Sequence, residues 1–220
     1  MSSNGDLVDA LAGEDGVLEL PKVLAAARIP VRGLTPGPRR WALSWISADG
    51  SDDQVDEVAL GFHTADGRSA VIAQAAALPP LELAERVATP LALDAWRSKG
   101  LGNTASFAVS RAASEAVWRD GGAPPRPGVG AALMWAKGHL AVGDAPPVRL
   151  AAAEDGAAER LGVVLATLGV AEEEVDHLLS SVAVLEPGDA LARELQVGYR
   201  RHLAQRWWDA PRQPYRPYRR

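Results

Sequence analysis

The chain has 220 residues, of which 47% are hydrophobic and 23% charged, and its formal net charge is −5. This composition is ordinary for a globular protein with a sizeable core. The absence of cysteine excludes disulfides, thiolate metal ligands and a cysteine nucleophile. We find neither a signal peptide nor the roughly 20 consecutive apolar residues of a membrane helix. We therefore expect a cytoplasmic protein without a membrane span, and the excess of Arg over Lys suggests a bacterial, GC-rich genome.

Helices are predicted at the start of the chain. Asn4 or Ser3 is expected to cap a first helix that ends at Gly13, and Pro21 begins a second helix that runs to Arg28. The segment 30–38 contains three prolines, which leave few donors for a strand ladder, so we expect a loop there.

Residues 39–76 carry the clearest structural pattern. Trp41, Leu43 and Trp45 alternate with smaller residues, a period of two that is typical of a half-buried strand. A polar loop is predicted at 49–53. Two strands alone are marginal, so this strand is expected to join the hairpin that follows it.

The hairpin signal is Asp66-Gly67, which favours a two-residue type I′ turn. With these two residues as the loop, Phe62 pairs with Val71 and Leu60 pairs with Ala73. This register places the apolar residues of both strands on one face of the hairpin. Those residues are Val58, Leu60, Phe62, Val71, Ala73 and Ala75.

The segment after the hairpin mixes helix and strand signals. Two helices are predicted, at 81–87 and 91–99, because Thr89-Pro90 resembles an N-cap followed by a first-position proline. Residues 105–109 alternate like a short strand, and 111–119 are predicted to be helical.

The segment 121–130 is rich in Pro and Gly and is predicted to be a loop or linker. It separates an α+β region at 1–120 from a second region at 131–209, which is followed by an extended basic tail at 210–220. In the second region, an apolar run at 131–135 is expected to turn back at Lys137-Gly138.

A further strand is predicted at 148–151, and the rest of this region is predicted to be helical. From Gly156 to Ser181 the apolar residues around Gly169 match the core spacing of a helix-turn-helix. The second helix would begin with the carboxylates of 172–174 and Asp176, which repel DNA phosphates. We therefore favour a structural helical hairpin, which would bind protein if the fold is winged-helix-like.

The C-terminal end is basic. From Gln196 to Arg220 there are seven Arg and one Asp, a net charge of +6, so the preceding residues carry −11 to give −5 in total. A helix is predicted from Pro187 to Trp207 or Trp208, followed by a Pro-Tyr-Arg tail that favours an extended chain. Tyr, Trp and Arg are enriched at binding hot spots. The predicted partner-binding residues are Arg200, Arg201, Arg206, Trp207, Trp208, Arg212, Tyr215, Arg216, Tyr218, Arg219 and Arg220.

Catalytic motifs were not found. The four histidines lie on different predicted elements, and Glu173 with His177 supplies only two potential metal ligands, which we interpret as an exposed helical pair. No phosphate-binding loop or nucleophile elbow occurs. We therefore assign no catalytic, cofactor-binding or metal residues and expect no cofactor. A pocket holding His63 or His139 beside a carboxylate would favour an enzyme.

These patterns predict an α+β fold: a small, mainly antiparallel sheet, made of the meander 39–76 and one or two later strands, with packed helices and a helical C-terminal third. The leading hypothesis is a non-catalytic adaptor or chaperone-like protein that contacts a protein partner through its C-terminal helix and tail. The alternative is a nucleic-acid-associated protein that uses the basic C-terminal segment. A third hypothesis is an enzyme whose site is not visible as a motif, and the tail by itself could also be a disordered, solubilising end.

Overall fold

The computed structural model describes residues 4–35, 41–51, 53–97, 117–118, 133–140, 147–156 and 161–209. The elements follow in chain order. They are α1 (Asn4–Leu11), α2 (Leu20–Ala26), β1 (Arg32–Leu34), β2 (Ala42–Ser51), β3 (Gln54–His63), β4 (Ser69–Ala75), α3 (Pro80–Arg97), β5 (Val117–Trp118), β6 (Ala136–Leu140), β7 (Val148–Asp155), β8 (Leu161–Leu168), α5 (Glu172–Ser180), β9 (Val182–Val184) and α6 (Ala190–Asp209).

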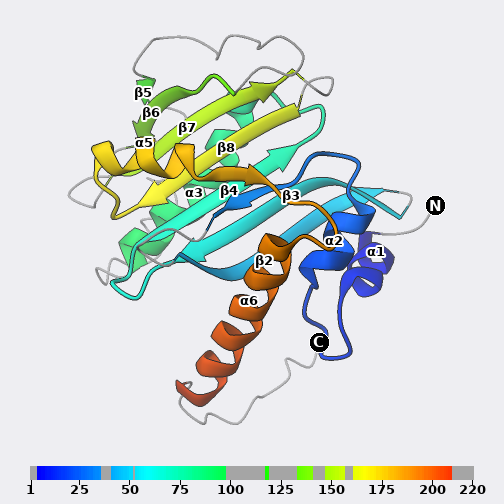
Figure 1. Cartoon of the computed structure of the whole chain (residues 1–220). Coiled ribbons are helices and arrows are strands. Elements are labelled where there is room, and N and C mark those ends of the chain that lie inside the picture. Colours follow the sequence, from blue (N-terminus) through cyan, green and yellow to red (C-terminus); the bar gives the residue numbers. More distant parts are fainter. Residues whose placement is uncertain are drawn as a thin grey trace, which may run out of the picture.

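The fold is α+β, as predicted (Figure 1). Seven strands form one antiparallel sheet in the order β2-β3-β4-β8-β7-β6-β5, and β1 pairs with β9 in a separate two-stranded sheet. The large sheet therefore joins strands from both sides of the predicted linker. In Figure 1, α3 lies on one face of the sheet, while α5 and α6 lie on the other. Among the described residues, no helix is long and apolar enough to cross a membrane.

The largest core cluster lies between the sheet and the helices α1, α2 and α6. Leu60, Ile72 and Leu165 come from neighbouring strands and are almost completely buried. Leu20 and Leu195 reach the same cluster from α2 and α6. The helices α1, α2 and α6 begin and end close to the predicted residues.

The other face of the sheet is covered by α3. Its Leu83 and Leu91 pack against Ala73, Val148 and neighbouring residues of β4, β7 and β8. The two helices predicted on either side of Thr89-Pro90 are one continuous helix, so this prediction was wrong. A proline removes one backbone donor, but Leu83, Ala84 and Ala88 before it and Leu91 and Ala92 after it are buried against the sheet.

The β3–β4 hairpin forms, but its predicted register was wrong by one residue. Phe62 pairs with Ala70, and Leu60 pairs with Ile72. The connection is longer than two residues: the N–H of Gly67 donates to the carbonyl of Thr64 at 3.1 Å, and Gly67 alone in this turn has a positive φ, of 84°. A type I′ turn needs two such residues, whereas a three-residue loop needs one.

A shift of one residue moves every side chain to the other face. Val71, Ala73 and Ala75 accordingly lie under α3, opposite the face that holds Val58, Leu60 and Phe62. The pattern could not reveal this, because β4 is buried on both faces and either register looks apolar.

Strand β2 also departs from its predicted pattern. Its register shifts between Leu43 and Trp45, so Leu43 is buried while Trp45 is exposed and lies over Gly61. The strand continues to Ser51, so most of the loop predicted at 49–53 is strand.

The predicted helix-turn-helix is wrong in its first half. Residues Leu161–Leu168 form β8, which lies between β4 and β7 in the middle of the sheet. A strand that is buried on both faces shows a continuous apolar run without alternation, which sequence periodicity cannot distinguish from a buried helix. The second half is a helix, as predicted.

The acidic start of α5 has basic partners on the sheet. Glu172 pairs with Arg149 at 3.2 Å, Glu174 pairs with Arg68 at 2.9 Å, and Asp176 pairs with Lys137. These carboxylates are therefore turned toward β4, β6 and β7 rather than toward a nucleic acid.

Several short strands were not predicted. Residues Arg32–Leu34 form β1 within the predicted loop 30–38, and Val182–Val184 form β9. Residues 117–118 are strand rather than helix, and β6 passes through Lys137-Gly138 without the predicted turn. The strand predicted at 105–109 and the linker at 121–130 lie outside the described residues. The predicted strand at 148–151 is confirmed as part of β7.

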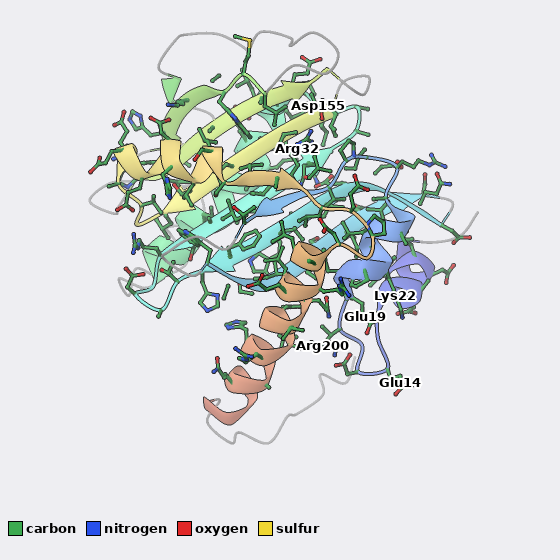
Figure 2. The ribbon with its side chains drawn as sticks, viewed as in Figure 1. Glu14, Glu19, Lys22, Arg32, Asp155 and Arg200 are labelled. Carbon is green, nitrogen blue, oxygen red and sulfur yellow. The ribbon has the colours of Figure 1, made fainter. Side chains whose placement is uncertain are left out.

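A buried ion pair attaches β1 to the main sheet (Figure 2). The guanidinium of Arg32 pairs with Asp155 at the end of β7, and both side chains are about nine-tenths buried, with 10% and 7% exposed. The backbone N–H of Arg32 donates to the side-chain oxygen of Gln74. These contacts hold the two-stranded sheet over β4 and β7.

Candidate functional site

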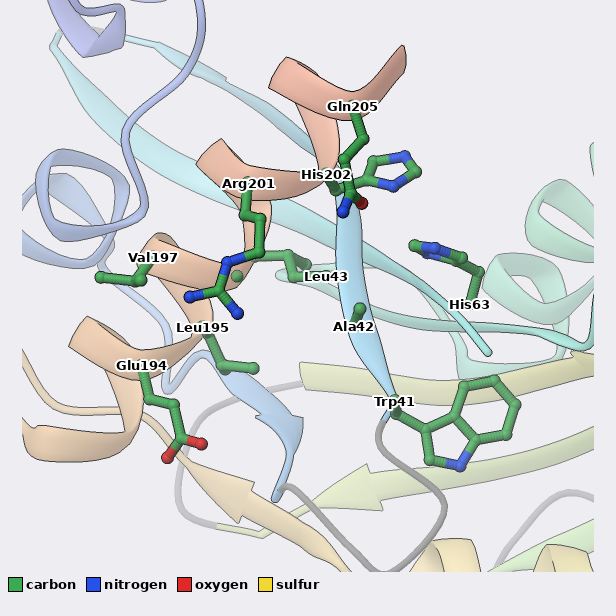
Figure 3. Close-up of a pocket in the computed structure, with 11 residues that line it drawn as sticks. Trp41, Ala42, Leu43, His63, Glu194, Leu195, Val197, Arg201, His202 and Gln205 are labelled. Atoms are coloured by element: carbon green, nitrogen blue, oxygen red, sulfur yellow. The ribbon is translucent and has the colours of Figure 1, made fainter. Parts of the chain in front are cut away.

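A cleft with a volume of about 590 Å³ lies between α6 and the first residues of β2 (Figure 3). Strand β2 is at one edge of the sheet. Of the apolar residues around the cleft, Val197 is exposed, whereas Trp41, Leu43 and Leu195 are buried in the core beneath it. Its polar lining comes from Glu194, Arg201, His63, His202 and Gln205. Among the described residues, the cleft therefore offers several hydrogen-bond donors, the carboxylate of Glu194 and the exposed side chain of Val197.

The first half of α6 is held firmly against the body. Leu195 and Tyr199 are buried, and the side-chain oxygen of Gln196 accepts a hydrogen bond of 2.8 Å from the backbone N–H of Leu20. Arg200 pairs with Asp15 and, at 2.9 Å, with Glu19. Figure 2 shows Arg200 directed toward the N-terminal helices. These contacts fix one wall of the cleft.

The same contacts shift two pKa values. The pKa of Asp15 is lowered, first by a hydrogen bond from the backbone N–H of Val17 and then by the charge of Arg200. Burial raises the pKa of Tyr199 above its usual value of 10.0. Both shifts agree with a helix that is docked through its first half.

The cleft side of α6 also carries positions that are not used for packing. Val197 lines the cleft and is 58% exposed. Gly198 also lines the cleft, and a Cβ atom added there would meet nothing within 4 Å. Glycine in a helix interior costs about 0.5–1 kcal/mol relative to alanine. Neither the backbone nor the packing of the described residues requires this glycine.

Two of the four histidines meet at this cleft. The rings of His63 at the end of β3 and His202 on α6 have centroids 4.2 Å apart and planes inclined by 49°. Figure 3 shows the two imidazoles turned toward each other across the gap between strand and helix. Sequence analysis did not pair these residues, because their proximity depends on how α6 docks on β2.

The predicted partner-binding residues have different places. Arg200 is engaged in ion pairs, so it contributes to docking α6 rather than to an open surface. Arg201 lines the cleft. Residues 206–208 belong to α6, but their side chains are outside the described part of the chain. Arg212, Tyr215, Arg216, Tyr218, Arg219 and Arg220 are outside the described residues.

Among the other polar candidates, His139 lines a small pocket together with Arg149 and Glu172. His63 and Glu194 line the α6 cleft, so each histidine named for the enzyme hypothesis lies in a pocket that also contains a carboxylate. Glu173 and His177 are both exposed on α5. His139 is exposed on β6. Within the described ranges, no three side chains of His, Asp or Glu come together in a way that could hold a metal ion.

The comparisons with known proteins add no relative. No protein family, curated protein or solved structure matches the chain.

Proposed function

We propose that this chain is a non-catalytic interaction or assembly protein, adaptor or chaperone-like, that contacts a protein partner through α6 and the tail that follows it. The observation that carries the proposal is the open, cleft-lining side of α6 around Gly198. The space next to this glycine is not filled by the described residues. A side chain of a partner fits there without displacing any described part of the chain.

The cleft also favours one kind of partner segment. An extended peptide can add to the outer side of an edge strand such as β2 through backbone hydrogen bonds. Val197 supplies exposed apolar surface, and Arg201 and Gln205 supply donors, beside the carboxylate of Glu194. A segment that combines apolar and acidic residues is complementary to this lining.

Site-specific crosslinking tests the proposal. A photoreactive amino acid is placed at Val197 in the cleft or, as a control, at Val184, an exposed valine (41%) on β9. We expect a discrete crosslinked protein from position 197 and none from position 184. Equal labelling from both positions, or none from position 197, would contradict the proposal.

Filling the cleft supplies a second, matched comparison. Gly198→Leu places a large side chain in the open space, whereas Gly198→Ala leaves most of that space free. We expect the leucine variant to lose the crosslink from position 197 and the alanine variant to keep it. Retention of the same crosslinked protein by the leucine variant would place the contact elsewhere.

The nucleic-acid hypothesis rests on the net charge of +6 from Gln196 to Arg220. The ion pairs of Arg200 withdraw one of these seven arginines from such a surface. If nucleic acid is the partner, binding falls steeply with salt and disappears when the chain is truncated after Asp209. If protein docking is the function, neither the full nor the truncated chain binds nucleic acid at physiological salt.

A further inference from the structure

We propose that His63 and His202 form a binding site for a divalent transition-metal ion such as Zn²⁺. The two side chains come from β3 and α6 and face each other with ring centroids 4.2 Å apart (Figure 3). Neutral imidazole nitrogen is a preferred ligand of zinc, copper and nickel. Two imidazoles held by separate elements form a chelating pair.

The geometry needs only a small adjustment. On a tetrahedral ion with metal–nitrogen bonds of about 2.0–2.1 Å, the centroids of two ligating rings lie roughly 5 Å apart. The observed 4.2 Å therefore has to increase by roughly 1 Å. Both side chains line the cleft and are only partly buried, so rotation of the rings provides this change.

The other residues that line the cleft affect the affinity for the metal ion. Gln205 lines the same cleft, and its amide oxygen is available as an additional ligand. Arg201 is a nearby cation that weakens the binding of a metal ion, and Glu194 is the one carboxylate in the lining. With two histidine ligands, fewer than the four of a structural zinc site, the ion exchanges with solvent. Its affinity falls at acidic pH, because protons compete for the imidazoles.

Metal binding has a structural consequence at this position. The ion would connect α6 directly to β3, beyond the part of α6 that Arg200 and Tyr199 anchor. It would thereby stabilise the folded state in proportion to its concentration. This consequence is independent of the proposed protein partner.

The chain provides its own controls, because the other two histidines lie on different elements. Zn²⁺ is titrated by calorimetry into the untagged full chain and into His63→Ala, His202→Ala and the double variant His139→Ala/His177→Ala. We expect one bound ion per chain, with affinity reduced by roughly 100-fold in either cleft variant, which loses the chelate advantage. The double variant of the exposed histidines should bind like the unaltered chain.

A second measurement uses the unaltered chain, so its result does not depend on whether the histidine variants fold. Added Ni²⁺ should broaden the imidazole proton signals of His63 and His202 before those of His139 and His177. The proposal is overturned if the unaltered chain binds no Zn²⁺, if removing His139 and His177 abolishes binding, or if Ni²⁺ broadens all four histidines equally.

Discussion

The centre of the sheet and its β2 edge differ in strand pairing and in side-chain burial. At the centre, β8 has a paired strand on each side and packed side chains on both faces, and nearly every residue is buried. At the edge, β2 is paired on one side, and its first residues face the cleft beside α6. In the centre, the apolar residues are explained by packing within the chain. At the edge, residues such as Gly198 and Val197 have no such explanation in the described structure.

This difference indicates where function is to be sought. A buried central residue is constrained by the fold itself, so its identity says little about a partner. The exposed valine and the helix-interior glycine beside the open cleft are not fixed by the packing of the described residues. Substitutions in the two regions should therefore have opposite signatures: large losses of stability in the interior, and losses of binding with little change in stability at the edge.

The largest effect is expected from breaking the buried ion pair. Asp155→Ala leaves the Arg32 guanidinium buried without its carboxylate, which should lower the free energy of unfolding by about 3–5 kcal/mol. Urea denaturation checks this value. The double variant Arg32→Met/Asp155→Leu removes both charges and should recover most of the loss. If the double variant is as unstable as Asp155→Ala, the unpaired charge is not the cause.

The next effect compares the centre with the edge directly. Leu165→Ala removes a side chain that is 1% exposed and should cost about 2–5 kcal/mol of unfolding free energy. Val197→Ala, at a position that is 58% exposed, should change it by no more than about 0.5 kcal/mol. Thermal and urea denaturation of the two variants side by side measure the contrast. Similar losses would mean that the cleft side of α6 is part of the core.

The smallest effect has the opposite sign. Gly198→Ala should raise the free energy of unfolding by about 0.5–1 kcal/mol, because alanine is the better helix former and its Cβ meets nothing within 4 Å. Denaturation of this variant checks the gain. A loss of stability would show that the conformation or packing of the folded chain itself requires glycine at this position.

Sequence signals near the boundaries of an element predicted α6 and the β3–β4 hairpin. The helix of α6 follows from Pro187 and the apolar spacing after it, and the hairpin follows from Asp66-Gly67. The hairpin register and β8 could not be predicted in the same way, because both depend on burial on two faces. That burial is created by strands and helices far away in the sequence, so no local period records it.

Few of the residues that line the cleft were singled out in the sequence. The C-terminal helix was selected by its charge and aromatic content, and Arg201 does line the cleft. The residues that give the cleft its character, Gly198 and the His63–His202 pair, carry no local signal. A glycine in a helix and two histidines on different elements gain meaning only when α6 is placed beside β2.

The pairing of β4 with β8 has a consequence for how the chain folds. Ser69 pairs with Leu168, and Ala75 pairs with Gly162, so the centre of the sheet joins segments that are far apart in the sequence. High contact order of this kind slows folding. During synthesis, the β2–β3–β4 meander emerges first and presents the apolar, unpaired edge of β4 until β8 leaves the ribosome. The nascent chain is therefore most prone to aggregation in that interval, and a chaperone that shields β4 would have its largest effect then.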